Sequence, residues 1–141
     1  DDVKIAISLS HFQGDVLVGL APIASIGVDL VKVRSINESK LAQRVLTADE
    51  HEVWVNLNSC GLERLFVYWA LKEAMIKCVG GNGWQMKSWQ VTFGDGCCEG
   101  YNQNLSATCR AKYLVLSGGV IVAWAWLEVS DCSWLGFQVV N

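Results

Sequence analysis

The stretch WALKEAMIKCVG, Trp69 to Gly80, is the second half of a run that predicts one long helix, from about Leu62 to Val79. Apolar residues recur through this run at helical spacing. The two glycines that follow Val79 tolerate the positive φ that often ends a helix. Placing the residues at intervals of about 100° puts Glu73 inside the apolar stripe. The helix therefore carries a carboxylate on a face that is directed to the protein interior.

Periodicity alone leaves two interpretations of Glu73 open. An ionised carboxylate in apolar surroundings is unfavourable unless a partner or a metal offsets its lost hydration. Lys77 lies four residues later on the same face, and an ion pair between them would contribute about 0.3–0.5 kcal/mol. Alternatively, Glu73 binds a hard cation such as Mg²⁺ while neighbouring lysines hold an anion.

Three strand candidates precede the helices. VKIAISLS, residues 3–10, alternates apolar and polar side chains. VLVGLAPIA, residues 16–24, returns after the turn residues 13–15 and predicts a hairpin. IGVDLVKV, residues 26–33, is the third candidate.

Two short helices are predicted between the third strand and the long helix. Asn37 is a suitable N-cap for a helix that ends near Leu46. Thr47 and Glu50 have the T-x-x-E spacing of a capping box, which predicts a second helix through about Val55.

The chain after Gly80 is rich in strand-forming residues. Turns are predicted at residues 94–100 and 118–119, and they separate three segments: SWQVTFG, ATCRAKYLVLS and VIVAWAWLEV. Strands, then helices, then strands predict an α+β fold in which a mostly antiparallel sheet packs against a long helix. We expect residues 1–141 to form a single domain, because a chain of this length fits one core.

Composition excludes several classes of function. The net charge of -3 gives no overall attraction to a nucleic acid, which favours basic proteins. The N-terminus is acidic and no apolar run reaches the roughly 18 residues of a membrane span, so we expect a soluble, cytoplasmic protein without a membrane partner. The six cysteines lack C-x-x-C spacing, which favours reduced thiols over disulfides or zinc.

Two segments resemble the paired signature of the 4'-phosphopantetheinyl transferase superfamily. IGVDLV contains the pattern G-[IV]-D, in which Asp29 is the acid. WALKEAMIKCVG matches [FW]-x-x-K-E-A-x-x-K in full, including Lys72, Glu73 and Lys77.

Two further segments agree with the same family in the same order along the chain. QRVLTADE is similar to the pattern R-x-[LF]-[ST]-x-x-E, with Arg44 and Glu50 in place. Upstream, ISLSH is similar to a strand ending S-[IV]-S-H, with Ser10 and His11 at its end. Four ordered matches are much less expected by chance than any single one.

The resemblance implies transfer of 4'-phosphopantetheine from coenzyme A to a serine of an acyl or peptidyl carrier protein, with release of adenosine 3',5'-bisphosphate. Asp29 and Glu73 correspond to the carboxylates that hold Mg²⁺. Such a reaction depends on positioning and on stabilisation of charge, so it needs no activated protein nucleophile. The resemblance implies a catalytic set of Glu73, Lys77 and Glu50.

The resemblance also implies which residues hold coenzyme A: Ser10, His11, Arg44, Lys72 and Lys77. Lys77 corresponds to a lysine that contacts the phosphates, and His11 to a histidine on the nucleotide side. Glu50 corresponds to a residue that helps to deprotonate the serine or its water. Glu50 equally fits the plain role of a capping-box acid, and this choice stays open.

The chain mixes features of two branches of the family. Val31 stands where the longer, surfactin-synthetase-activating type has a third acid. An apolar residue at this position is a feature of the short holo-acyl-carrier-protein-synthase type. The Ser-His strand precedes G-V-D, as in the longer type, but most of that type's first half is missing. We therefore expect a half-domain that is cut from a longer chain or completed by a preceding half-domain or a second copy. The alternative function is a noncatalytic module that docks a carrier protein or a neighbouring domain.

Overall fold

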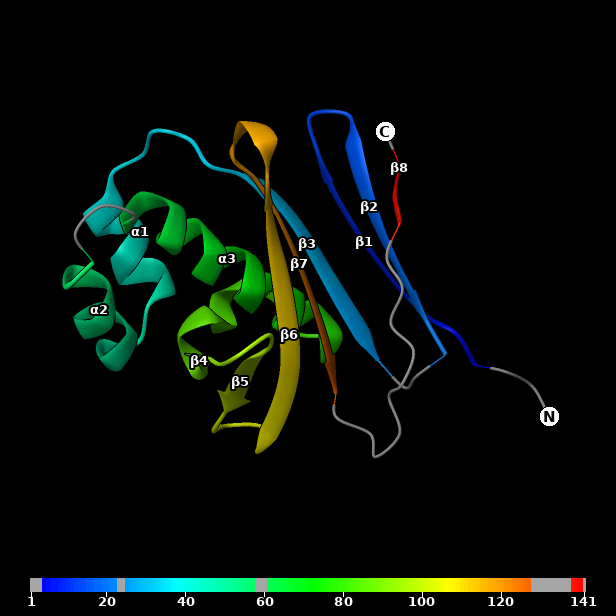
Figure 1. The fold of residues 1–141 in the computed structure, drawn as a ribbon. Coiled ribbons are helices and arrows are strands. Elements are labelled where there is room, and N and C mark those ends of the chain that lie inside the picture. Colours follow the sequence, from blue (N-terminus) through cyan, green and yellow to red (C-terminus); the bar gives the residue numbers. More distant parts are fainter. Residues whose placement is uncertain (1–3, 23–24, 58–60, 128–137, 141) are drawn as a thin grey trace.

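The computed structural model describes residues 4–22, 25–57, 61–127 and 138–140, and these form three layers (Figure 1). Helices lie on one face of a five-stranded antiparallel sheet, and a smaller sheet built on the N-terminal hairpin lies on the other face. The predicted α+β class with an antiparallel sheet is confirmed.

The five-stranded sheet has the strand order β3-β7-β6-β5-β4. Its strands are β3 (Ile26–Lys32), β7 (Val120–Leu127), β6 (Ala107–Leu116), β5 (Cys98–Asn102) and β4 (Trp89–Phe93). Because side chains alternate across a sheet, Trp124 and Trp126 of β7 pack toward the hairpin, whereas Ala123 and Ala125 pack toward the helices.

Three helices and a short 3₁₀ helix cover the other face. They are α1 (Glu38–Val45), α2 (Ala48–Val55), α3 (Gly61–Cys78) and the 3₁₀ helix η1 (Gly83–Ser88). The side chain of Asn37 accepts a hydrogen bond from the backbone N–H of Lys40, and Thr47 forms a reciprocal capping box with Glu50. Both predicted caps are confirmed. Helix α3 is apolar on most sides because it is packed between β3, β7, β6 and the other helices.

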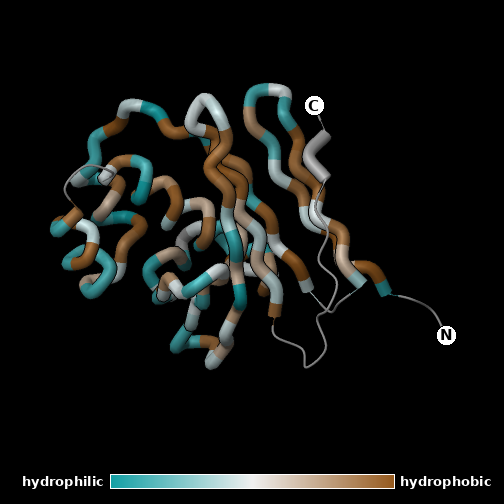
Figure 2. The backbone as a smooth tube through the Cα atoms, in the orientation of Figure 1, coloured by the Kyte–Doolittle hydropathy of each residue, from teal (hydrophilic) through white to brown (hydrophobic). Residues whose placement is uncertain are grey.

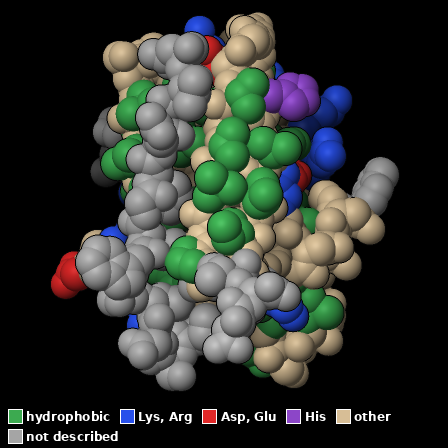
Figure 3. Space-filling view, turned by 90° about the vertical axis from the view of Figure 1, so that its right-hand side faces the viewer, with side chains coloured by type: hydrophobic (Ala, Val, Ile, Leu, Met, Phe, Trp, Pro, Cys, Tyr) green, Lys and Arg blue, Asp and Glu red, His purple; other side chains and the backbone are tan. Residues whose placement is uncertain are grey.

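The small sheet consists of β1 (Ala6–Phe12), β2 (Asp15–Ala21) and β8 (Gln138–Val140) in the order β1-β2-β8. One face of the hairpin contacts the large sheet, and on β1 this buried face carries the polar Ser8 and Ser10, so hydropathy alternates along β1 (Figure 2) with the apolar side chains on the other face. That buried face includes Leu17 and Ala21. The opposite face carries an exposed apolar patch, formed by Ile5, Ile7, Leu9, Val16 and Leu20, which Figure 3 shows as a contiguous hydrophobic area.

One strand prediction was wrong. Residues 94–100 were expected to be a turn, but the turn is shorter and strand β5 begins at Cys98. Gly100 belongs to this strand because its missing side chain leaves room for Met75, whose sulfur would lie 2.2 Å from a Cβ atom there. Close packing, rather than turn geometry, explains this glycine.

Some sequence predictions fall outside the described residues. These are Val3, residues 23–24 and 128–129 of the expected strands, and the thiols of Cys60 and Cys132. The remaining cysteines are free thiols, as predicted: Cys78, Cys97, Cys98 and Cys109. Within the described ranges, no helix combines the length and the apolar character needed to cross a membrane.

Candidate functional site

The ammonium group of Lys77 joins helix α3 to strand β3. Its Nζ atom donates hydrogen bonds to Oδ1 of Asp29 at 2.9 Å and to the backbone carbonyl of Val28 at 3.0 Å. Gly27 permits this approach, because a Cβ atom at that position would lie 1.8 Å from the carbonyl oxygen of Ala74 in α3. The G-V-D segment and the K-E-A-x-x-K segment therefore meet at one point.

Ser10 fixes the same carboxylate from the hairpin side. Its Oγ atom donates to Oδ1 of Asp29 at 3.1 Å and accepts a hydrogen bond from the backbone N–H of Leu30 at 3.0 Å. Asp29 is only 7% exposed, and Oδ1 takes both donors. Within the described residues, Oδ2 of Asp29 accepts no hydrogen bond, so one oxygen of this anchored carboxylate stays available to a ligand.

Glu73 lies close enough to Asp29 for the two carboxylates to repel each other. Burial raises the pKa of Glu73 above its ordinary value, and the negative charge of Asp29 raises it further. The positive charges of Lys77 and Arg44 act on this pKa in the opposite direction, but more weakly. In the described structure the Glu73 carboxylate accepts no hydrogen bond and forms no ion pair within 4.0 Å.

This pair of carboxylates fits a hard divalent cation. A cation between Asp29 and Glu73 would relieve their mutual repulsion and would satisfy oxygens that otherwise have no partner. Among the described residues, no group of three or more His, Cys, Asp or Glu side chains is arranged so that it could hold a metal ion. Mg²⁺ is commonly held by one or two protein carboxylates, while water and substrate oxygens fill its other coordination positions.

Arg44 and His11 lie differently with respect to these carboxylates. The guanidinium of Arg44 lies over the ring of Trp69, 5.2 Å from its centre, and its charge reaches Glu73. The side chain of His11 is exposed and alternates with that of Ser10 along β1, so it projects from the outer face of the hairpin. The structure thus brings Arg44 toward the pair and directs His11 away from it.

Glu50 and Lys72 form a separate, fully buried ion pair. The Lys72 Nζ atom lies 2.5 Å from Oε2 of Glu50 and donates to the carbonyl of Val45 at 2.7 Å. The Glu50 carboxylate also accepts hydrogen bonds from the backbone N–H groups of Thr47 and Val91. Burial lowers the pKa of Lys72, and the charge of Glu50 opposes this shift. With exposed fractions of 0% and 1%, these side chains have no access to a bound substrate in this structure.

Three contributors at this site were not anticipated from the sequence. The carbonyl of Val28 holds Lys77, Ser8 accepts the backbone N–H of Val28 at 3.0 Å, and Gly83 lies beside the Glu73 carboxylate. The two-residue spacing of Ser8 and Ser10 was the available signal, since alternate residues of a strand point to the same side. A backbone carbonyl and a glycine leave no such signal.

Two comparisons relate this chain to known proteins. The sequence model of the 4'-phosphopantetheinyl transferase superfamily matches residues 25–123, a range that includes Asp29, Glu73 and Lys77. No curated protein sequence matches the chain. The holo-[acyl-carrier-protein] synthase of Thermotoga maritima has a similar fold, with a TM-score of 0.63 and 23% sequence identity. The alignment covers 74% of this chain and 62% of that synthase.

The matched range holds the whole contact between β3 and α3, whereas the hairpin residues of the site, Ser8, Ser10 and His11, lie outside it. The likeness to the synthase independently supports the same α+β architecture. The chain belongs to the 4'-phosphopantetheinyl transferase superfamily.

Proposed function

We propose that this protein transfers 4'-phosphopantetheine from coenzyme A to a serine of an acyl or peptidyl carrier protein of fatty acid, polyketide or peptide synthesis, and that it requires Mg²⁺. The observation that carries the proposal is the contact between Lys77 and Asp29 beside the unpaired Glu73 carboxylate. This cluster supplies two carboxylates for a metal and one ammonium group for phosphate oxygens. Membership of the superfamily supports the same reaction.

Asp29 and Glu73 would hold the ion. When bound, Mg²⁺ would supply positive charge to the pyrophosphate oxygens of coenzyme A. Ser10 keeps Asp29 in position through Oδ1 and leaves Oδ2 for the ion. Lys77 is 31% exposed, so its ammonium can reach a phosphate without leaving the site. Arg44 adds a second positive charge near Glu73.

In the proposed transfer the carrier serine oxygen bonds to the phosphorus that carries pantetheine. The bond from that phosphorus to the bridging pyrophosphate oxygen breaks, and adenosine 3',5'-bisphosphate leaves with that oxygen. The serine proton passes to solvent or to a phosphate oxygen. The hydrogen bonds that occupy Glu50 support a positioning role for Glu50 and Lys72, which hold α2 against α3, over a direct role in proton transfer or in binding coenzyme A.

His11 would contact the nucleotide only if a further surface faces the outer side of the hairpin. That side carries the exposed apolar patch of β1 and β2, where Ile7 is 64% exposed and Leu9 is 60% exposed. A second copy of the chain or a preceding half-domain would bury this patch and bring a pocket wall to His11. Association of two copies through this patch can be measured by sedimentation. Leu9→Glu should abolish this association, whereas the exposed Lys40→Gln variant should keep it.

The reaction is tested by incubating the protein with coenzyme A, Mg²⁺ and several apo carrier proteins. Mass spectrometry should reveal a phosphopantetheine group on the carrier serine. The variants Asp29→Asn and Glu73→Gln should lower kcat/KM by about a hundredfold or more, and the exposed Glu63→Gln variant in the same helix should not. Binding of a carrier without any modification would favour the noncatalytic docking module instead. A folded sample that binds neither coenzyme A nor a carrier would contradict both functions.

A further inference from the structure

Strand β6 extends beyond its neighbour β5 and leaves half of its length with one edge unpaired. The pairing of β6 with β5 runs from Ala107 to Ala111 and stops there. Residues 112–116 continue to pair with β7, but on the other edge no described strand pairs with them. Their outward N–H and C=O groups are therefore free to pair with an added strand.

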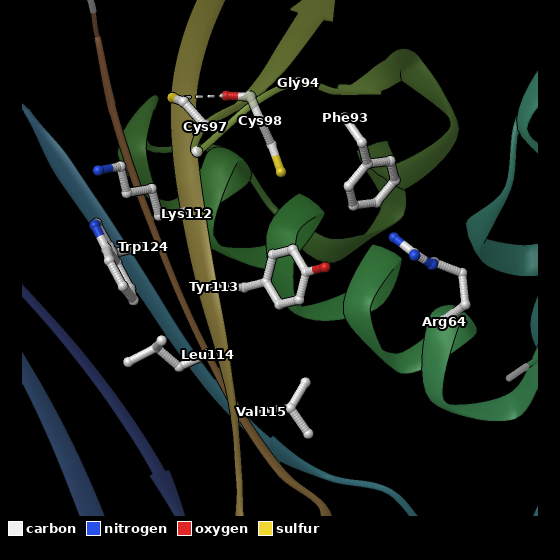
Figure 4. A pocket seen from close by; sticks show the side chains of 11 residues that line it. Arg64, Phe93, Gly94, Cys97, Cys98, Lys112, Tyr113, Leu114, Val115 and Trp124 are labelled. Carbon is white, nitrogen blue, oxygen red and sulfur yellow. Dashed lines mark hydrogen bonds between the residues drawn. The ribbon is translucent and has the colours of Figure 1, made fainter.

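A hollow of about 680 Å³ lies along this unpaired edge (Figure 4). Its walls come from Tyr113, Leu114 and Val115 of β6, from the β4–β5 turn and from Arg64 at the start of α3. Leu114 is 53% exposed and Val115 is 41% exposed, so this edge presents apolar side chains to solvent. An unpaired sheet edge presents main-chain groups that can pair with another chain, and added strands are one of the recurring ways in which proteins bind extended segments.

Positive charge lies on both sides of the edge. Arg64 lies over the ring of Phe93, 4.5 Å from its centre, on the side of α3 toward which Tyr113 points. Lys112 lies with Trp124 on the opposite side of β6, as Figure 4 shows. In the described part of the chain neither cation has an ion-pair partner within 4.0 Å, and none of the residues lining the hollow is acidic.

We propose that this edge binds an extended, acidic segment of a partner protein, which adds to β6 as an antiparallel or parallel strand. Alternate side chains of an added strand point to opposite faces. Two neighbouring acidic residues would therefore meet Arg64 on one face and Lys112 on the other. A second copy of this chain fits less well, because edge-to-edge pairing would bring two arginines and two lysines together.

This surface is distinct from the proposed transfer site. Arg64 and Lys77 lie thirteen residues apart in α3, which corresponds to about 20 Å along the helix axis. A segment bound at β6 would leave Asp29 and Glu73 open to coenzyme A. The surface would thus hold a partner protein or a tethering segment while transfer takes place elsewhere.

The test uses a fluorescent eight-residue peptide of alternating valine and threonine with two adjacent glutamates at its centre. Fluorescence anisotropy with the full chain at low salt should detect binding, and NMR should locate the shifted amides at residues 112–116. A peptide with glutamines in place of the glutamates should bind roughly tenfold more weakly. A peptide with an N-methyl group on every amide should not bind, because its main chain has no N–H left to donate from either edge.

Variants of the protein test the same charge contacts from the other side. Arg64→Gln and Lys112→Gln should each weaken binding of the acidic peptide but not of the glutamine peptide, and the exposed Lys40→Gln variant should leave both unchanged. Equal binding of the acidic and glutamine peptides would overturn the charge assignment. Binding that survives N-methylation, no binding at about 1 mM protein, or self-association through the same amides would overturn the proposal.

Discussion

The ammonium nitrogen of Lys77 lies 2.9 Å from Oδ1 of Asp29, although the two residues are 48 positions apart in the chain. The expected i,i+4 alternative was an ion pair between Lys77 and Glu73, and no such pair lies within 4.0 Å in the described structure. Lys77 instead neutralises one carboxylate of the pair and leaves Glu73 without a hydrogen-bond partner. Buried polar groups in proteins normally have a hydrogen-bond partner, so the unpaired Glu73 carboxylate favours a binding role over a purely structural one.

Ser10 and Ser8 offer a matched pair of substitutions. Each hydroxyl accepts a backbone N–H of β3, but only Ser10 also donates to Asp29. Ser10→Ala and Ser8→Ala should each lower the free energy of unfolding by about 1–3 kcal/mol, because a buried N–H loses its acceptor. Only Ser10→Ala should also weaken stabilisation by Mg²⁺, measured as the shift of the urea midpoint. An equal loss of the Mg²⁺ effect in both variants would reduce Ser10 to a purely structural residue.

Gly27→Ala should disrupt the contact between β3 and α3. The added Cβ would lie 1.8 Å from the carbonyl oxygen of Ala74 and 2.5 Å from the backbone nitrogen of Cys78, so the helix itself must move. We expect a loss of at least about 3 kcal/mol in urea unfolding, at the upper end of overpacking effects. Gly61→Ala is the control, since its Cβ would meet no atom closer than 3.4 Å. Similar stability of the two variants would contradict this account of the close approach.

The buried pair of Glu50 and Lys72 should show strong coupling. Glu50→Gln leaves the Lys72 ammonium without its counterion in the core, and we expect a loss of about 3–5 kcal/mol. The double variant Glu50→Gln with Lys72→Met should lose clearly less than the sum of the two single variants. Urea unfolding of all four proteins completes the double-mutant cycle. Additive losses would mean that the two charges do not stabilise each other.

Much of the fold could be predicted from local patterns. The long helix ends at a glycine pair, and the capping residues Asn37 and Thr47 form hydrogen bonds that depend only on neighbours within a few residues. Strand β5 could not be predicted in this way, because Gly100 is required by the Met75 side chain from a distant helix. Local signals do not contain contacts between segments far apart in the chain.

The candidate site could be predicted only in part, because it also depends on contacts between segments far apart in the chain. Spacing placed Glu73 and Lys77 on one face, and family resemblance added Asp29. Neither could separate Lys72 from Lys77, which stand in one motif but point to different places: Lys72 into the core toward Glu50, and Lys77 toward Asp29. Nor could they place His11 on the outer side of the hairpin, since that depends on how the hairpin packs against β3.

The state of Glu73 predicts how stability depends on pH and on metal. Its pKa is raised above 4.5 in the folded protein by burial and by Asp29. The folded state therefore favours the protonated acid, and without metal this contribution to stability is present at low pH and is lost as pH rises through the raised pKa. Glu73→Gln should remove this loss, so in EDTA at pH 7 the variant should be more stable than the unmodified protein.

Magnesium should reverse that order. The ion competes with the proton for Glu73, so its stabilising effect should grow as pH rises through the raised pKa of Glu73, and should reach about 1.4 kcal/mol at ten times Kd. Glu73→Gln should show little response, whereas the exposed Glu63→Gln variant should respond like the unmodified protein. Urea midpoints measured over a series of pH values, with EDTA and with Mg²⁺, provide the measurement. A Mg²⁺ response that is unchanged in Glu73→Gln would remove Glu73 from the metal site, because the lost carboxylate would then have held no ion.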